Sequence, residues 1–278
     1  MKETFNNKSS GSILSFISNV FYSTIAFFIV CGIFLACLAV YIIKINSSLP
    51  EISAIKSMSA RGSIAISYAE MPGFLSKTIV CVCDPDFFSH KGLLTSSLKT
   101  DAMKLYNGEK IENKDKTLTQ NLAAIALNIN ESGSSDSTAF INRTVSHLKE
   151  CLLALKIESK IKSKDKILEI YLNNAPFGEG VSGLLQASVV YFNKKPADLS
   201  EAECITLTAI LKTQFKIKGE KSIESLSKER EKIIALITER GIVDRAKAEA
   251  YIFDDLKLNS YQSRINRFNE TGVSIIKM

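Results

Sequence analysis

The chain has 278 residues, of which 46% are hydrophobic and 8% aromatic, and its formal net charge at pH 7 is +6. This composition excludes an intrinsically disordered protein and allows one sizeable core or two small ones. The modest basic excess favours an anionic surface or ligand, such as phospholipid headgroups or pyrophosphate. Nucleic acid is disfavoured as a partner, because the lysines are dispersed along helices among acidic neighbours, without interleaved aromatic side chains.

No charged residue occurs between Lys8 and Lys44, and the centre of this segment, residues 21–43, is nearly all apolar. About 20 such residues span a bilayer as a helix. We therefore expect a tail over residues 1–12 and one transmembrane helix over residues 13–44. A cleavable signal peptide would have a shorter apolar run and a small-x-small cleavage site behind it. Basic residues on the two sides of the helix nearly balance, so charge alone leaves the orientation open.

Six cysteines are spread over the chain without a CxxC pair, namely Cys31, Cys37, Cys81, Cys83, Cys151 and Cys204. Because the chain adds only two histidines, the sequence disfavours a structural zinc site. The sequence leaves open whether any of the last four cysteines are paired.

A carboxylate lies at Glu150, where a plain amphipathic helix would carry an apolar side chain. Its helical neighbours at i−3, i+3, i+4 and i+7 are His147, Leu153, Ala154 and Ile157. A carboxylate on such a face is paired, hydrogen-bonded, raised in pKa or open to a cleft. Glu150 is therefore a candidate site residue, and a simple structural pairing with His147 is the alternative.

The segment that follows predicts two more helices around a turn. Ser163 can cap a helix over residues 164–173, whose inward positions are apolar. Glycines at positions 178, 180 and 183 then allow the backbone to approach another element or a ligand closely.

These segments resemble the glycosyltransferase family 51 domain, the peptidoglycan glycosyltransferase of monofunctional transglycosylases and class A penicillin-binding proteins. The matching residues are Lys149, Glu150, Ala154, Glu158, Ser163, Lys164, Ile167, Leu168, Tyr171, Leu172, Asn173, Phe177, Gly178, Gly180, Gly183, Ala187, Tyr191, Phe192, Lys194, Leu199 and Glu203. The resemblance implies a mainly α, lysozyme-like domain over residues 45–256, on one N-terminal transmembrane helix. A polar tail over residues 257–278 is not covered by it.

Residues 83–92, CDPDFFSHKG, resemble the first motif of the family, with Asp84, Phe87, His90 and Gly92 in matching positions. Cys83 stands where the family has its catalytic glutamate, the general base that takes the proton from the acceptor's sugar hydroxyl. A thiol titrates near about 8.5 and is shorter than glutamate. Loss of a general base costs about 100- to 10,000-fold in rate. We therefore expect impaired catalysis, unless the backbone turns Asp84 inward to substitute.

Residues 114–123 resemble the second motif, with Thr117, Thr119, Gln120, Leu122 and Ala123 in matching positions. Three residues, Lys114, Asp115 and Lys116, stand where the family has Gly-Gly-Ser. There Asp115 would repel an anion at the helix N-terminus, and the two lysines would partly compensate. An ordinary N-capped helix with Leu118, Leu122, Ile125 and Ala126 buried also accounts for this stretch.

The resemblance implies roles for individual side chains. The candidate catalytic residues are Glu150, Cys83 and Asp84. The candidate substrate-binding residues are His90, Thr119, Gln120, Lys149 and Phe87. Lys149 would contact the donor pyrophosphate, and Glu150 would assist the leaving group directly or through a metal ion. No cofactor is certain, and a divalent cation, magnesium or manganese, on the donor pyrophosphate is an option.

The resemblance also implies a place in the cell and a set of partners. It implies the bacterial inner (plasma) membrane, with the main domain on the periplasmic or extracellular side. The expected partners are a lipid II-type lipid-linked disaccharide and the membrane, with other cell-wall synthesis proteins as candidates.

Several hypotheses for the activity stay open. The chain is a donor-binding relative with impaired catalysis in glycan assembly, an active inverting polymerase of glycan strands, or a non-catalytic scaffold that binds a partner. A lysozyme-like hydrolase is least favoured, because it would need a second carboxylate at glycosidase spacing from Glu150.

Overall fold

The computed structural model of the chain describes residues 7–58, 65–94, 100, 102–104, 106–109, 116–128, 138–178, 180–213 and 220–253. The expected tail over residues 257–278 lies outside these ranges, as do residues 1–6 of the expected N-terminal tail. Within them the chain is helical or irregular, apart from one isolated β-bridge between Pro176 and Ser182. The mainly α fold class is confirmed. The chain divides into two units, Met1–Leu49 and Pro50–Met278.

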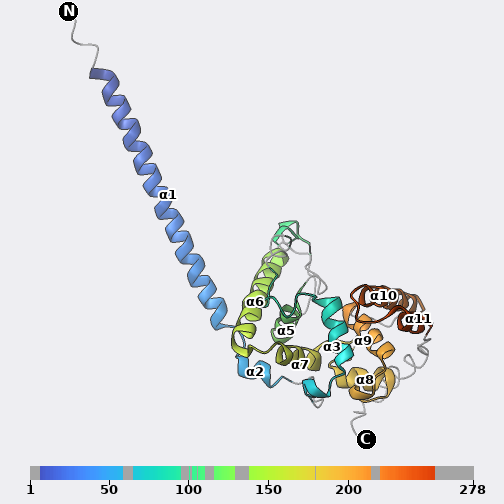
Figure 1. The fold of residues 1–278 in the computed structure, drawn as a ribbon. Helices are drawn as coiled ribbons and strands as arrows, with labels where there is room; N and C mark the ends of the chain where they lie inside the picture. Colours follow the sequence, from blue (N-terminus) through green and yellow to red (C-terminus); the bar gives the residue numbers. More distant parts are fainter. Residues whose placement is uncertain are drawn as a thin grey trace, which may run out of the picture. The chain divides into compact units, whose positions relative to one another are not determined.

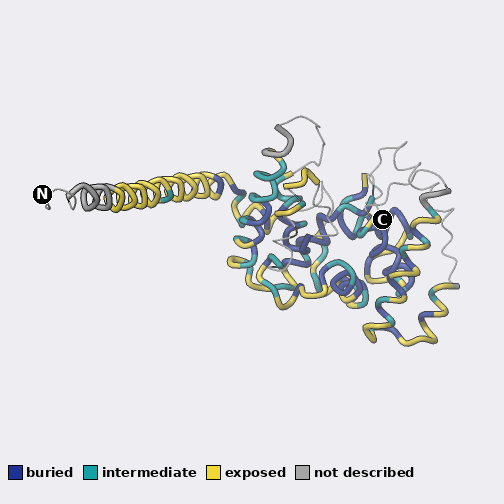
Figure 2. The backbone as a smooth tube through the Cα atoms, turned by 90° about the horizontal axis from the view of Figure 1, so that it is seen from above, coloured by how far each residue is buried: buried dark blue, intermediate teal, exposed yellow. Residues whose placement is uncertain are grey.

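The first unit is dominated by helix α1 (Asn7–Ser47). Its apolar part, Phe16–Ser47, is 32 residues long, which exceeds the roughly 20 residues that cross a bilayer. Nearly all of its described side chains are exposed (Figure 2), as in a helix that packs against no protein core. The helix therefore fits the expected transmembrane segment.

The second unit consists of short helices (Figure 1). They are α2 (Ile52–Lys56), the 3-10 helix η1 (Tyr68–Glu70), α3 (Gly73–Cys83), α5 (Leu118–Ala126), α6 (Thr138–Ile161), α7 (Lys164–Asn174), α8 (Leu184–Phe192), the 3-10 helix η3 (Pro196–Asp198), α9 (Glu201–Thr213), α10 (Glu220–Glu239) and α11 (Arg245–Phe253). In one group α5, α6 and α7 pack against one another; in the other, α3, α9 and α10 do so, and α11 packs on α10.

Side-chain caps set where the central helices begin. Thr117 Oγ1 accepts a hydrogen bond from Gln120 N at 3.0 Å, and Thr117 N donates to Gln120 Oε1 at 2.9 Å. This reciprocal pair satisfies two backbone donors at the start of α5. The predicted cap at Ser163 is confirmed, because its hydroxyl accepts from Lys166 N at 3.3 Å.

The inward faces of these helices form the core (Figure 2). Leu118 and Leu122 of α5 and Leu153 and Ile157 of α6 are fully buried. Burial of each such side chain contributes about 1.5–3 kcal/mol. Ile125 and Ala126, also expected inside, are only partly buried near the end of α5.

Candidate functional site

Glu150 lies on α6 and is only 2% exposed. Lys116, directly before the cap of α5, places its ammonium Nζ 3.0 Å from Glu150 Oε2 and 3.2 Å from Oε1. The Lys116 side chain is itself only 5% exposed. His147 also faces the carboxylate, with Nδ1 at 3.8 Å from Oε2. The burial of Glu150 agrees with the sequence analysis, whereas the pairing with Lys116, 34 residues earlier, was missed.

The Lys116 ammonium occupies the position where a cation would bind Glu150. A divalent ion on this carboxylate would lie beside a fixed positive charge in a poorly solvated place, where repulsion is weakly screened. Among the described residues, no group of three or more His, Cys, Asp or Glu side chains could hold a metal ion. The residues that the structure describes therefore do not fit a divalent cation at Glu150.

Cys83 ends α3 and is partly exposed. Lys212 of α9 and Glu229 of α10, which form an ion pair at 3.0 Å, both act on it electrostatically. Loss of solvation nevertheless dominates and raises the pKa of the Cys83 thiol to about 12. At pH 7 only about one such thiol in 100,000 is ionised. Cys83 therefore cannot act as a general base near neutral pH.

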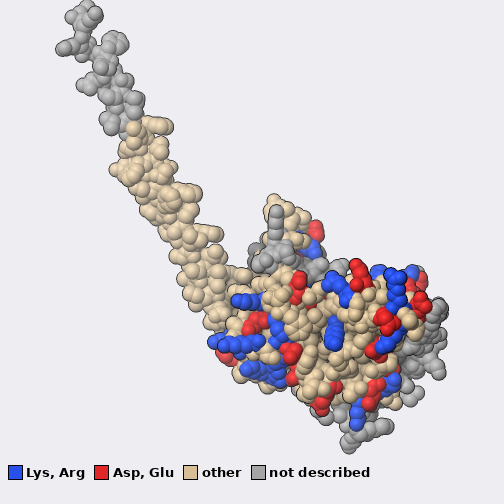
Figure 3. All heavy atoms as spheres, viewed as in Figure 1, with Lys and Arg blue, Asp and Glu red and all other residues tan. Residues whose placement is uncertain are grey.

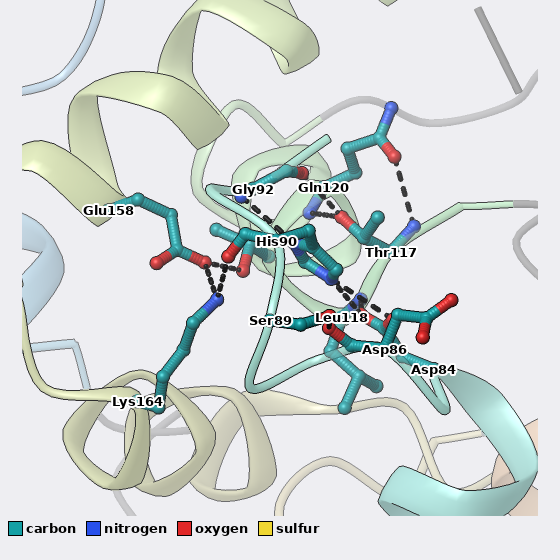
Figure 4. Close-up of polar contacts among 11 residues, drawn as sticks. Asp84, Asp86, Ser89, His90, Gly92, Thr117, Leu118, Gln120, Glu158 and Lys164 are labelled. Carbon is teal, nitrogen blue, oxygen red and sulfur yellow. Dashed lines mark hydrogen bonds and ion pairs between the residues drawn. The ribbon is translucent and has the colours of Figure 1, made fainter. Parts of the chain in front are cut away.

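Asp84 is buried and fully engaged by neighbours (Figure 4). Both carboxylate oxygens lie 3.0 Å from His90 Nε2, and one accepts from Leu118 N at 2.9 Å. Gly92 N donates to His90 Nδ1 at 2.9 Å, so the ring proton lies on Nε2 and points at Asp84. The carboxylate thus links the end of α3 to the start of α5, and both of its oxygens are within hydrogen-bonding distance of groups in the protein.

Lys164 of α7 connects the first motif to a network that includes helices α5, α6 and α7. Its Nζ donates to His90 O at 2.8 Å and to Glu158 Oε1 at 2.7 Å, and lies 4.6 Å from the Phe87 ring centroid. Thr119 Oγ1 donates to the same oxygen of Glu158 at 2.7 Å. Figure 4 shows Lys164 and Glu158 meeting beside the loop that carries His90. The matching positions of the family pattern therefore build a polar network between α5, α6, α7 and this loop.

Gly92 lets that loop lie directly against α6. Its φ is +95°, and a Cβ there would be 3.0 Å from both Ala154 O and Glu158 Cγ. Thr117 Oγ1 also donates to Gly92 O at 2.7 Å. Only glycine accommodates both the left-handed backbone and the close approach.

The predicted substrate-binding residues fall into two kinds. Phe87 is fully buried, and the polar side-chain atoms of His90, Thr119 and Gln120 bond within the protein. Lys149 is partly exposed on α6 and makes no ion pair with the described part of the chain. Contact with substrate stays a prediction for all five, and Lys149 is the one whose charged group makes no ion pair within the described ranges.

His147 adds positive charge to the site. Burial by itself lowers the pKa of His147. Hydrogen bonds and charge interactions with Cys151 and Glu150 together have a larger effect in the opposite direction and raise this pKa to about 9. The imidazole is therefore protonated at neutral pH. Lys116 and His147 together exceed the single negative charge of Glu150, which favours an anionic ligand.

The chain is similar to a known family and to several known proteins. A family model described as Transglycosylase matches residues 51–238, well over half of the chain. Penicillin-binding protein 1F of Bacillus subtilis is 31% identical over 184 residues, which are 66% of this chain and 24% of that protein. Penicillin-binding protein 1A of Pseudomonas aeruginosa is 24% identical over 243 residues, 81% and 28% of the two chains. Penicillin-binding protein 1A of Aquifex aeolicus is 28% identical over 201 residues, which are 71% of this chain and 26% of that protein.

The chain spans about a quarter of the length of these relatives. The match begins at the second residue of the second unit and contains the three motifs around Cys83, Thr117 and Glu150. This protein therefore belongs to the transglycosylase family, glycosyltransferase family 51.

Proposed function

We propose that this protein is a membrane-anchored transglycosylase relative that binds lipid II-type lipid-linked disaccharide pyrophosphates, and that its own site residues impair glycan polymerisation. Family membership supports the substrate class, and α1 supports the anchor. The domain lies on the outer side of the membrane, where such donors are polymerised. The observation that carries the proposal of impairment is the buried ion pair between Lys116 and Glu150.

Inverting transfer needs a base for the acceptor hydroxyl and stabilisation of the departing pyrophosphate. Cys83 is protonated near neutral pH, so the step that removes the hydroxyl proton lacks its base. Glu150 is bound to the Lys116 ammonium, so it is not available to the leaving group. Absence of the base alone accounts for a loss of about 100- to 10,000-fold.

Donor binding places fewer demands on the site than catalysis. A pyrophosphate needs positive charge and hydrogen-bond donors, which Lys149 and protonated His147 supply from one helix, α6. The charge of Lys116 adds to the field although Glu150 engages its ammonium. Basic and acidic side chains are interspersed on the face shown in Figure 3.

The test uses the full chain in detergent with labelled lipid-linked disaccharide, and scores binding and polymer separately. The unaltered chain is expected to bind without forming polymer. Cys83→Glu combined with Lys116→Ser is expected to gain polymer formation, because it returns a base and releases Glu150. Circular dichroism must show this variant to be folded, since Lys116→Ser also leaves the buried Glu150 carboxylate without its partner. Adding Glu150→Gln should abolish that gain, whereas the exposed Lys160→Ser should change neither signal.

Two results would contradict the proposal. Polymer formed by the unaltered chain would establish an active polymerase. Absence of binding, in a chain that circular dichroism shows to be folded, would leave a scaffold that acts through a protein partner.

A further inference from the structure

Exposed lysines lie at the ends of two helices of the second unit that pack against each other, α2 and α6 (Figure 1). Lys56 is the last residue of α2, Lys160 lies in the last turn of α6, and Lys162 follows that helix directly. Lys156, one turn before Lys160, is partly exposed. Within the described part of the chain none of these four lysines forms an ion pair. We call them the α2–α6 basic surface.

Acidic side chains offset this charge only in part. Both acidic residues of α6, Glu150 and Glu158, lie in ion pairs with other lysines. The exposed acidic residues nearest in sequence are Glu51, directly before α2, and Asp165, in the first turn of α7. Four lysines therefore face two carboxylates, and the net positive charge attracts anions.

The chain itself keeps this surface close to the membrane anchor. The second unit begins at Pro50, three residues after Ser47, the last residue of α1, and three residues span at most about 11 Å. Lys156 Nζ donates to Pro50 O at 3.3 Å, so α6 packs against the first residue of the second unit. Attraction between charges extends about 8 Å at physiological ionic strength. The link is therefore short enough for these lysines to reach charges at the membrane surface.

We propose that the α2–α6 basic surface docks on the headgroups of anionic phospholipids and so sets how the tethered domain stands on the bilayer. Each lysine near an anionic leaflet favours the docked state about fivefold, so the three exposed lysines favour it about 100-fold. Leu155, which is 43% exposed on α6, adds an apolar contact at the headgroup boundary.

This attraction orients a tethered domain and is too weak to hold a detached one at the membrane. A factor of about 100 corresponds to a dissociation constant of only about 10 mM. The anchor makes docking an intramolecular step, which raises the effective concentration of the surface at the headgroups. The inference rests on α1 as the anchor and not on donor binding. The donor assay takes place in detergent without an anionic bilayer, so either proposal can fail alone, and Lys160 remains a control there.

The test uses a fluorophore on the exposed side of α6. The chain contains no tryptophan, so Ser159→Trp introduces a single one between Lys156 and Lys160. The full chain is reconstituted in vesicles of phosphatidylcholine, with or without phosphatidylglycerol, whose brominated acyl chains quench nearby tryptophan. Quenching is expected to be stronger with phosphatidylglycerol. It should fall to the phosphatidylcholine value at about 1 M salt, where the screening length is about 3 Å.

Two matched sets of substitutions identify the surface. In the Ser159→Trp chain, quenching with phosphatidylglycerol should fall to the phosphatidylcholine value after the joint changes Lys56→Gln, Lys160→Gln and Lys162→Gln. The control removes three exposed lysines from other elements and should leave quenching unchanged: Lys77→Gln, Lys195→Gln and Lys232→Gln. Circular dichroism checks that each variant is folded.

Two outcomes would overturn the proposal. Equal quenching in the two kinds of vesicle would show that anionic headgroups are not the partner and would leave a solvated or protein-binding surface. An equal loss in the control set would show that net charge, and not this surface, is responsible.

Discussion

At the scale of single residues, Lys116 and Glu150 form a buried ion pair. Each is a charge taken out of water, and such a pair is tolerable only while both partners are present. In the proposal of impaired catalysis, the same pairing keeps Glu150 from the leaving group, so the stability of the fold and the proposed impairment have one physical origin.

Lys116→Met is therefore expected to destabilise the second unit by about 3–5 kcal/mol, because it leaves the Glu150 carboxylate buried and unpaired. Lys116→Met with Glu150→Leu should recover most of the loss, since apolar groups of similar volume need no partner. The measurement is chemical denaturation followed by circular dichroism. Equal stability of the single and double variants would contradict this account, and Lys160→Met should stay within about 0.5 kcal/mol.

His147 predicts a pH dependence of stability. Its folded pKa, about 9, lies above the ordinary value of 6.5, so the folded state binds the proton more tightly than the unfolded state. This stabilisation is complete below about pH 6.5 and is lost as pH rises through 9. We expect the free energy of unfolding to fall by about 2–3 kcal/mol between pH 6 and pH 9. His147→Gln should flatten that slope, and an unchanged slope would refute the assignment.

At the scale of elements, the loop after α3 holds the two helix groups together. It bonds to α5 through Asp84 and Gly92, and to α7 through His90. The family motif at this loop is therefore explained by packing as well as by chemistry, since its aspartate, histidine and glycine all make structural contacts.

Gly92→Ala is expected to lower the free energy of unfolding by about 2–4 kcal/mol, because it adds left-handed strain and overpacking against α6. Gly241→Ala is a matched control. Its φ is +68°, but a Cβ there has nothing within 4 Å, so only strain of about 1–2 kcal/mol remains. Thermal or urea denaturation distinguishes the two variants, and equal losses would show that contact with α6 is unimportant.

At the scale of the whole molecule, each of the two units has its own basis of stability. The apolar surface of α1 suits lipid, whereas the second unit buries its own core. Deletion of residues 1–49 is therefore expected to abolish flotation with phospholipid vesicles and to leave a folded helical domain. Flotation and circular dichroism measure the two expectations. A truncated chain that still floats would place a membrane-binding surface on the second unit.

The sequence by itself determined the apolar anchor, the helix over residues 164–173 with its Ser163 cap, the mainly α class and the family. The resemblance also predicts that Cys83 stands at the position of the family's base, and this stays a prediction. These properties depend on composition, on helical periodicity and on fixed spacing along the chain, all of which can be read locally.

Only the tertiary structure decided which charges meet. Lys116 reaches Glu150 because α5 packs against α6, and no local spacing relates residues 34 positions apart. Likewise, Asp84 accepts hydrogen bonds from His90 and Leu118 because the loop folds back onto α5. The pKa of the Cys83 thiol is raised because its neighbours remove it from solvent. Desolvation and long-range pairing are properties of packing, so sequence alone could nominate these side chains but not determine their chemical state.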